Sequence, residues 1–195
     1  MPYGTLPPPY AAAPPPGYFR PAPVPVSPAG VPLADFGTRL LAYLIDGILL
    51  SAVSLIIVLP VFIVFATQVL AAAPEPGTED DPGRFFATTF LPIIAFEAGI
   101  VVFSLGLSYL YSVEVMHRSG QTLGKRIMKI RVVPLDPNLR LTRTIAVKRW
   151  ATEFLPGTFV AVYALLDGLW QLWDRPFQQT LHDKAAQTVV VKVSA

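Results

Sequence analysis

Two long apolar segments dominate the pattern of hydrophobic and polar residues along the chain. Residues 39–66 and residues 85–113 carry few charged side chains. Each is long enough to cross a hydrocarbon core of about 30 Å, because some 20 helical residues suffice. A third apolar segment, residues 155–173, is just long enough to span as well. The pattern predicts an all-α membrane protein, built as a small bundle of three or four membrane helices.

Two shorter stretches have the pattern of β-strands instead. Residues 127–133 and residues 188–193 are rich in valine and isoleucine, which favour strands. An isolated strand pair is only marginally stable in water, so we expect the two stretches to pair against the membrane helices or lipid headgroups. The predicted fold therefore includes a short cytoplasmic strand pair.

This pairing bears on the third apolar segment, for which two topologies compete. If both strands lie on one side of the membrane, residues 141–173 must enter and leave by the same face, as a helical hairpin that turns at Pro156 and Gly157. In the alternative, residues 155–173 cross once and leave the C-terminus on the far side. We favour the hairpin, because Lys184 and Lys192 indicate a cytoplasmic C-terminus.

The first part of the chain has a different composition. Residues 1–34 are dominated by proline, alanine, glycine and tyrosine, with too few large apolar side chains to offset the loss of chain entropy on folding. We expect a disordered, proline-rich cytoplasmic tail over residues 1–34, followed by one membrane domain over residues 35–195. Residues 7–10 match the PPxY pattern that WW-type domains bind, but a flexible spacer is the preferred interpretation.

Charge distribution predicts the orientation. Basic residues outnumber acidic ones in residues 118–149, whereas residues 71–84 are acidic. Loops rich in lysine and arginine face the cytoplasm, so we place residues 118–149 and the tail inside and residues 71–84 outside. We attribute the net charge of +2 to this asymmetry and not to nucleic-acid binding. The basic loop is a candidate contact for anionic lipid through Lys125, Arg126, Lys129 and Arg131.

Arg39 and Asp46 lie seven residues apart within the first apolar segment. Seven helical steps of about 100° return the chain to nearly the same face, so both side chains leave one side of a helix. Arg39 can extend to the headgroups, but Asp46 lies roughly 10 Å deeper by helix rise. We expect Asp46 either to be protonated or to pair with a cation from the basic loop.

Further acidic residues extend this picture. Glu97 and Asp167 also fall in apolar segments, where ionisable residues are candidates for ion or solute sites. Together with Asp46 they form our candidate site. A bundle of three or four helices is thin for enclosing a water-filled path, so we expect a homo-oligomer. Asp183 precedes the last strand, where we expect it to cap a turn or helix.

Composition excludes several classes of chemistry. The chain is 53% hydrophobic and 14% charged, which is more apolar than an ordinary soluble domain. It contains no cysteine and only two histidines, so disulfides and thiolate metal sites are excluded and a histidine metal site is not expected. No arrangement typical of a hydrolase triad is evident. We therefore expect no metal, no cofactor and no enzymatic activity.

Taken in order, these residues resemble the RDD family of bacterial membrane proteins, which is named for one arginine and two aspartates. The matching residues are Arg39, Asp46 and Asp183, supported by residues 120–126 and residues 130–133. These three motif residues are also a candidate ion or solute site. The proline-rich tail is similar to those of actinobacterial proteins. The resemblance implies a multi-pass protein of the bacterial plasma (inner) membrane, and transport of a ligand is the activity usually suggested for the family.

Two functional hypotheses follow. The first is a membrane protein that handles or transports an ion or small solute through its intramembrane acids. The alternative is a non-transporting scaffold, which would bind a partner or anionic lipid through the proline-rich tail and the basic loop.

Overall fold

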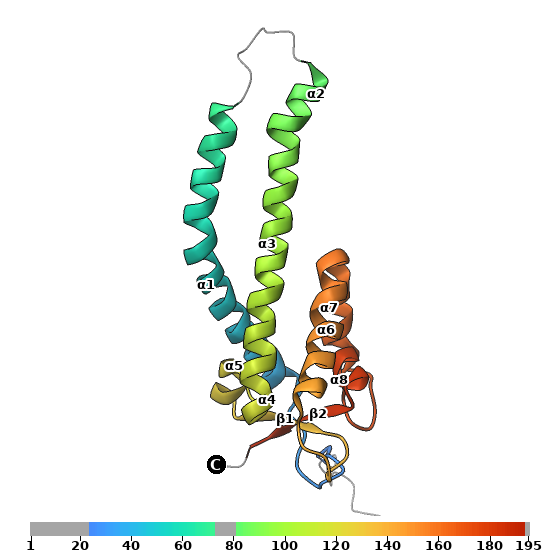
Figure 1. Ribbon diagram of the computed structural model, residues 1–195. Coiled ribbons are helices and arrows are strands. Elements are labelled where there is room, and N and C mark those ends of the chain that lie inside the picture. Colours follow the sequence, from blue (N-terminus) through green and yellow to red (C-terminus); the bar gives the residue numbers. More distant parts are fainter. Residues whose placement is uncertain (1–23, 73–80, 194–195) are drawn as a thin grey trace, which may run out of the picture.

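The computed structural model describes residues 24–72 and 81–193 (Figure 1). Most of residues 1–34 and of the acidic loop, including the PPxY match, lie outside the described residues. The elements are α1 (Phe36–Ala71), α2 (Pro82–Phe85), η1 (Phe86–Phe90), α3 (Leu91–Tyr109), η2 (Leu110–Val115), α4 (Met116–Ser119), α5 (Leu123–Ile127), β1 (Ile130–Pro134), α6 (Arg143–Phe159), α7 (Ala161–Trp170), α8 (Leu181–Ala185) and β2 (Thr188–Lys192).

Two helices are long and apolar enough to cross a membrane. They are α1, and the continuous helix Pro82–Ser119 that comprises α2 to α4 with the π-helical segments η1 and η2. Their most apolar windows have mean hydropathies of 3.0 and 2.1, and 0% of either window is buried by protein. The core helix of a soluble protein would be covered on its apolar sides. These long uncovered surfaces are typical of helices that face lipid.

The third apolar segment does not form a helix of spanning length. Helix α7 has 10 residues, which is about 15 Å of helix rise and half of a hydrocarbon core. Figure 1 shows α6 and α7 lying side by side as a hairpin beside the lower part of α3. The two ends of the hairpin therefore lie at the same end of the molecule, as the preferred topology requires.

The turn of this hairpin differs from the predicted position. Helix α6 continues through Pro156 and ends at Phe159, and Val160 forms the turn with a non-helical backbone. The Val160 amide still donates to the Pro156 carbonyl at 2.9 Å. A proline removes one helical donor but does not by itself end a helix. The prediction of a break at Pro156 and Gly157 is therefore wrong by a few residues.

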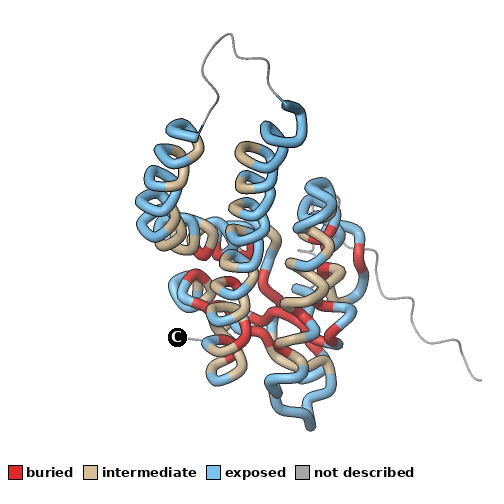
Figure 2. The backbone as a smooth tube through the Cα atoms, turned by 45° about the horizontal axis from the view of Figure 1, so that its top comes forward, coloured by how far each residue is buried: buried red, intermediate tan, exposed pale blue. Residues whose placement is uncertain are grey.

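The predicted strand pair is confirmed. Strands β1 and β2 are antiparallel, with Ile130 opposite Lys192 and Val133 opposite Val189. Ile130 and Val132 point into the core while Arg131 is exposed, which is the alternation expected for a sheet with one covered face. Figure 2 shows the buried residues gathered around this sheet, whereas the long helices are mostly exposed.

The segment that precedes α1 is part of this core. The Ala34 amide donates to the Val190 carbonyl at 2.9 Å, and the Lys192 amide donates to the Pro32 carbonyl at 2.9 Å. Leu33 and Ala34 are buried. Residues 24–34 thus extend the sheet along β2, and the predicted boundary of the tail at residue 34 is too late for the described residues.

Candidate functional site

The arginine and the second aspartate of the motif meet at the end of the long helices. Arg39 donates from Nη1 to Asp183 Oδ2 at 3.3 Å. Arg149 of α6 donates to the other carboxylate oxygen, Oδ1. Asp183 is fully buried, and both arginines are more than nine-tenths buried. One carboxylate thus holds two guanidinium groups from helices that are far apart in the sequence.

Arg39 also bonds to the backbone of the elements around it. Its Nε donates to the Ala34 carbonyl at 3.1 Å, Nη1 to the Gln178 carbonyl at 2.8 Å, and Nη2 to the Val190 carbonyl at 3.2 Å. The expectation that Arg39 extends to lipid headgroups is therefore wrong. The side chain turns inward because carbonyls and a carboxylate in the core satisfy more of its donors than one surface contact would.

Helix α8 fixes the position of Asp183. The Asp183 amide donates to Thr180 Oγ1 at 3.2 Å, and the Thr180 amide donates to Asp183 Oδ2 at 3.3 Å. This reciprocal pair is a capping box at the start of α8. The helix cap expected at this position is present. Burial raises the pKa of the Asp183 carboxyl, but the charges of Arg149, His182 and Arg39 outweigh that effect and hold the pKa below its ordinary value.

Asp46 forms a second polar cluster about two turns further along the same face of α1. Tyr111 donates its hydroxyl to Oδ1 at 2.5 Å, Thr122 donates to Oδ2 at 2.5 Å, and the Gly124 amide donates to Oδ1 at 2.7 Å. Lys125 Nζ lies 3.9 Å from Oδ2. Of the two states expected for Asp46, this geometry matches the one in which a cation from the basic loop pairs with it.

Two features of the backbone make this cluster possible. A Cβ atom added to Gly124 would lie 2.2 Å from the Ala42 carbonyl oxygen and 2.8 Å from Asp46 Oδ1, so only glycine lets α5 approach α1 this closely. Tyr111 belongs to the π-helical segment η2. A π-helical turn changes the direction of the side chains within a helix, and here Tyr111 reaches Asp46. Arg39, Ala42 and Asp46 are the buried residues of α1, as the seven-residue spacing predicts.

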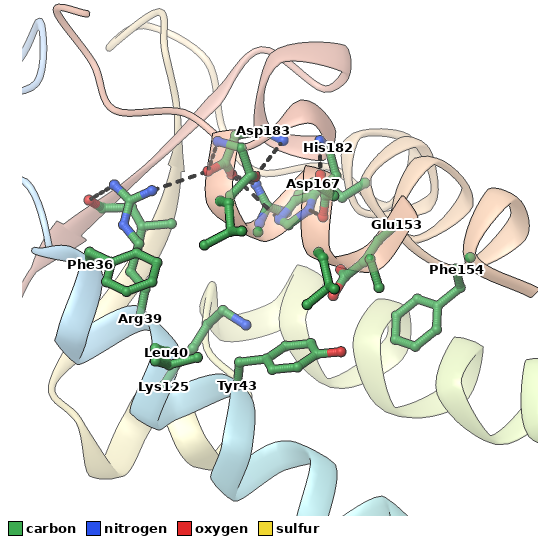
Figure 3. A pocket seen from close by; sticks show the side chains of 18 of the residues that line it. Phe36, Arg39, Leu40, Tyr43, Lys125, Glu153, Phe154, Asp167, His182 and Asp183 are labelled. Atoms are coloured by element: carbon green, nitrogen blue, oxygen red, sulfur yellow. Dashed lines mark hydrogen bonds and ion pairs between the residues drawn. The ribbon is translucent and has the colours of Figure 1, made fainter. Parts of the chain in front are cut away.

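A cavity of about 430 Å³ lies between α1 on one side and α6, α7 and α8 on the other. Its walls are mostly apolar, and Figure 3 shows the polar ends of Tyr43, Lys125 and Glu153 pointing into the space between these helices. Arg39, Arg149 and Asp183 form another part of its lining. The motif pair Arg39 and Asp183 therefore borders an open volume.

Asp167 lines the same cavity and pairs with a histidine. It accepts from the His182 amide at 2.9 Å through Oδ1, and its Oδ2 lies 2.6 Å from His182 Nδ1. His182 Nε2 is 4.0 Å from Asp183 Oδ1. This pair ties α7 to α8 next to the motif carboxylate.

The structure does not bring the predicted acids into one site. Asp46 and Asp167 belong to different clusters, and Glu97 is exposed on α3. Glu97 lies 14 residues from Tyr111 along the same helix, which is roughly 20 Å of helix rise. Within a single chain, the predicted grouping of Glu97 with Asp46 and Asp167 is therefore not present. Within residues 24–72 and 81–193, no group of three or more histidine, aspartate and glutamate side chains could hold a metal ion.

The basic loop divides into an inner and an outer part. Lys125 is partly buried and faces Asp46, whereas Arg126, Lys129 and Arg131 are exposed.

The sequence pattern did not identify Arg149 and Glu153 as site residues. Their spacing of four on α6 was the available signal, because it places both side chains on one helix face. Nothing local in the sequence points to Tyr111 as the partner of Asp46.

Comparisons with known proteins concern the family of the chain. The family model described as "RDD family" matches residues 33–187. The Bacillus subtilis (strain 168) protein with the printed name "Uncharacterized protein YxaI" is 31% identical over 98 residues, which cover 50% of this chain and 61% of that relative. The chain thus matches about three fifths of the length of this relative. No solved structure gives a significant match.

Proposed function

Because the chain belongs to the RDD family, we propose that it binds a small solute in the cavity between α1 and the α6–α7 hairpin and passes it across the plasma membrane. Family membership and the two long apolar helices make the chain an integral membrane protein. One observation carries the proposal further. The motif residues Arg39 and Asp183 border a cavity of about 430 Å³ that also holds Lys125, Glu153 and Asp167.

The proposed solute site lies at the edge of the membrane, whereas the acids grouped from the sequence were expected nearer its middle. Asp46 already accepts three hydrogen bonds, so little of its capacity remains for an ion. The cavity instead combines apolar walls with a few charged groups, which is typical of small-molecule sites. The charged groups of the motif are held in ion pairs with one another, so we propose a binding and transport role and not an enzymatic one.

The proposed orientation follows from charge. The exposed cations Arg126, Lys129 and Arg131 lie near the sheet end of the molecule, and such residues favour the cytoplasmic side. We propose that α1 and the helix Pro82–Ser119 cross the bilayer and that the α6–α7 hairpin enters it from the cytoplasm without crossing. A bundle with two long helices and a short hairpin is thin for enclosing a water-filled path, so we propose that the protein acts as a homo-oligomer.

Flux measurements in proteoliposomes test the proposal. Gly168 lines the cavity, and a Cβ atom there meets nothing within 4 Å, so we expect Gly168→Leu to narrow the cavity without a backbone clash. Gly99 on α3 is equally open but does not line the cavity, so Gly99→Leu is the matched control. We expect uptake of protons, Na⁺, K⁺ or leucine above empty liposomes in wild type and Gly99→Leu, and its loss in Gly168→Leu. The absence of any such flux in wild type would contradict transport.

The scaffold alternative rests on a separate observation. Arg126, Lys129 and Arg131 expose three cationic side chains within six residues, and each such residue near an anionic membrane surface contributes about 1 kcal/mol of attraction. Changing all three to glutamine should reduce retention of phosphatidylglycerol during purification. This change should leave flux through the cavity unaltered, which separates the two functions.

A further inference from the structure

The charged groups of the cavity differ in how fully they are paired. Arg39 and Arg149 share Asp183, and Asp167 is bonded to His182. Glu153 is different, because its carboxylate forms no hydrogen bond or ion pair with any of the described residues, although it lines the cavity. A carboxylate in a mostly apolar cavity favours a cationic partner. Among the described residues, no cationic side chain forms an ion pair with this carboxylate.

On the neighbouring wall, by contrast, hydrogen-bond donors lack acceptors. The Nε of Arg149 is buried and has no acceptor among the described residues. The ammonium of Lys125 has only long contacts, at 3.4 Å to Thr122 Oγ1 and 3.9 Å to Asp46 Oδ2. Burial lowers the pKa of Lys125, while the carboxylates of Asp46 and Glu153 oppose that shift. Arg39 and Arg149 share the one carboxylate of Asp183, so together with Lys125 this wall carries excess positive charge that favours an anionic acceptor.

The unpaired carboxylate of Glu153 and the incompletely paired donors of Arg149 lie next to each other. Arg149 and Glu153 are four residues apart on α6, which places them on one face about 6 Å apart along the helix axis. A ligand with only a negative charge would meet the carboxylate of Glu153. A ligand with only a positive charge would meet the excess donors of Lys125 and Arg149. A purely anionic ligand leaves the carboxylate of Glu153 without a partner, and a purely cationic ligand leaves the donors of Lys125 and Arg149 without one.

We infer that the cavity binds a zwitterion with an apolar portion, with its phosphate or carboxylate next to Lys125 and Arg149 and its primary ammonium next to Glu153. Phe36, Leu40 and Leu165 supply apolar wall for the remainder of the ligand. A free amino acid with an aliphatic side chain and the headgroup of an ethanolamine phospholipid share this chemistry. The inference rests on the proposed function, because it names the class of solute for the same cavity.

Binding of two matched probes tests the inference. The full chain is placed in nanodiscs of phosphatidylglycerol alone and titrated with leucine or with 4-methylpentanoate, which has the same carbon chain and carboxylate but no ammonium. Binding is measured by calorimetry and by the rise in unfolding temperature. We expect wild type to bind leucine about tenfold more tightly than 4-methylpentanoate, and Glu153→Gln to lose this preference. Glu97→Gln removes an equivalent charge outside the cavity and should keep the preference.

A second arm identifies the source of the zwitterion. In nanodiscs that contain phosphatidylethanolamine, a lipid ligand would stabilise wild type but not Glu153→Gln, and it would also weaken the binding of leucine. If leucine binds equally well in both lipids, the free solute is the ligand. Stabilisation by phosphatidylethanolamine without any binding of leucine assigns the lipid.

Failure of the inference can be distinguished from failure of the proposed function. Equal binding of leucine and 4-methylpentanoate, or a preference that survives Glu153→Gln, would overturn the zwitterion while leaving a solute cavity in place, provided that Gly168→Leu still abolishes binding. If neither leucine nor phosphatidylethanolamine binds to wild type, the inference is wrong. Persistent flux of protons or cations that is sensitive to Gly168→Leu would then still support the proposed function.

Discussion

Gly124→Ala is the substitution whose consequence follows most directly from the geometry. The new methyl group would lie 2.2 Å from the Ala42 carbonyl oxygen, which is backbone and cannot rotate away. Helix α5 must therefore move away from α1, and the 2.7 Å hydrogen bond from the Gly124 amide to Asp46 is lost with it. The substitution damages both the packing of the loop and the pairing of the buried carboxylate.

The expected magnitude follows from these two effects. Overpacking costs about 1–3 kcal/mol, and a hydrogen bond to a charged group contributes about 1.5–3 kcal/mol. We expect Gly124→Ala to lower the free energy of unfolding by about 3–4 kcal/mol. For a chain of this size that corresponds to a fall in unfolding temperature of roughly 6–15 °C.

Thermal unfolding in detergent, followed by circular dichroism, measures this change. Gly99→Ala is the control, because a Cβ atom at Gly99 meets nothing within 4 Å and alanine is favoured over glycine inside a helix by about 0.5–1 kcal/mol. That variant should unfold at or slightly above the temperature of wild type. If Gly124→Ala is as stable as wild type, α5 does not approach α1 as described and Asp46 is held in another way.

Three further predictions concern the motif and the topology. Asp183→Asn should lower the free energy of unfolding by about 3–5 kcal/mol in chemical denaturation, because two buried arginines lose their carboxylate; wild-type stability in this variant would contradict the ion-pair network. Because the folded-state pKa of Asp183 is depressed, its contribution should be constant above about pH 5 and fall as the pH drops below about 4, the ordinary pKa of an aspartate; an unfolding midpoint that is constant down to pH 2 would argue against it. The chain has no cysteine, so single substitutions report topology: Thr78→Cys should react with an impermeant thiol reagent in intact cells, while Asn138→Cys and Ser194→Cys should react only after the membrane is opened. Labelling of Ser194→Cys in intact cells would indicate a third crossing.

The sequence predicts those parts of the fold that depend on local pattern. The apolar segments 39–66 and 85–113 are long and uniform, so length and hydropathy alone identify α1 and the helix Pro82–Ser119. The seven-residue spacing of Arg39 and Asp46 correctly predicts one buried face of α1. The valine-rich stretches predict β1 and β2, because few other segments of the chain have that character.

The hairpin shows where local pattern is insufficient. Residues 155–173 read as one apolar run, but the chain turns at Val160, a residue type with no particular preference for turns. The position of the turn depends on what α6 and α7 pack against, which the sequence pattern does not contain. The same holds for the length of the tail, because Leu33 and Ala34 gain order only by packing along β2.

The candidate site depends even more on contacts between distant residues. Arg39 meets Asp183 across 144 residues, and Tyr111 meets Asp46 across 65. No periodicity relates these positions. The sequence therefore identifies candidate charged residues but does not predict which of them contact each other. Membrane depth alone predicts a group of Glu97, Asp46 and Asp167, whereas within one chain these three residues lie in different places.

We propose that the cavity bordered by Arg39 and Asp183 is open to the cytoplasmic side of the membrane. Ala164 lines this cavity, and a single cysteine there reports whether a reagent can enter. We predict that Ala164→Cys reacts with an impermeant thiol reagent in inside-out vesicles but not in intact cells, and that adding Gly168→Leu slows the reaction at least tenfold. Reaction in intact cells, or a rate in inside-out vesicles that Gly168→Leu does not change, would contradict the claim.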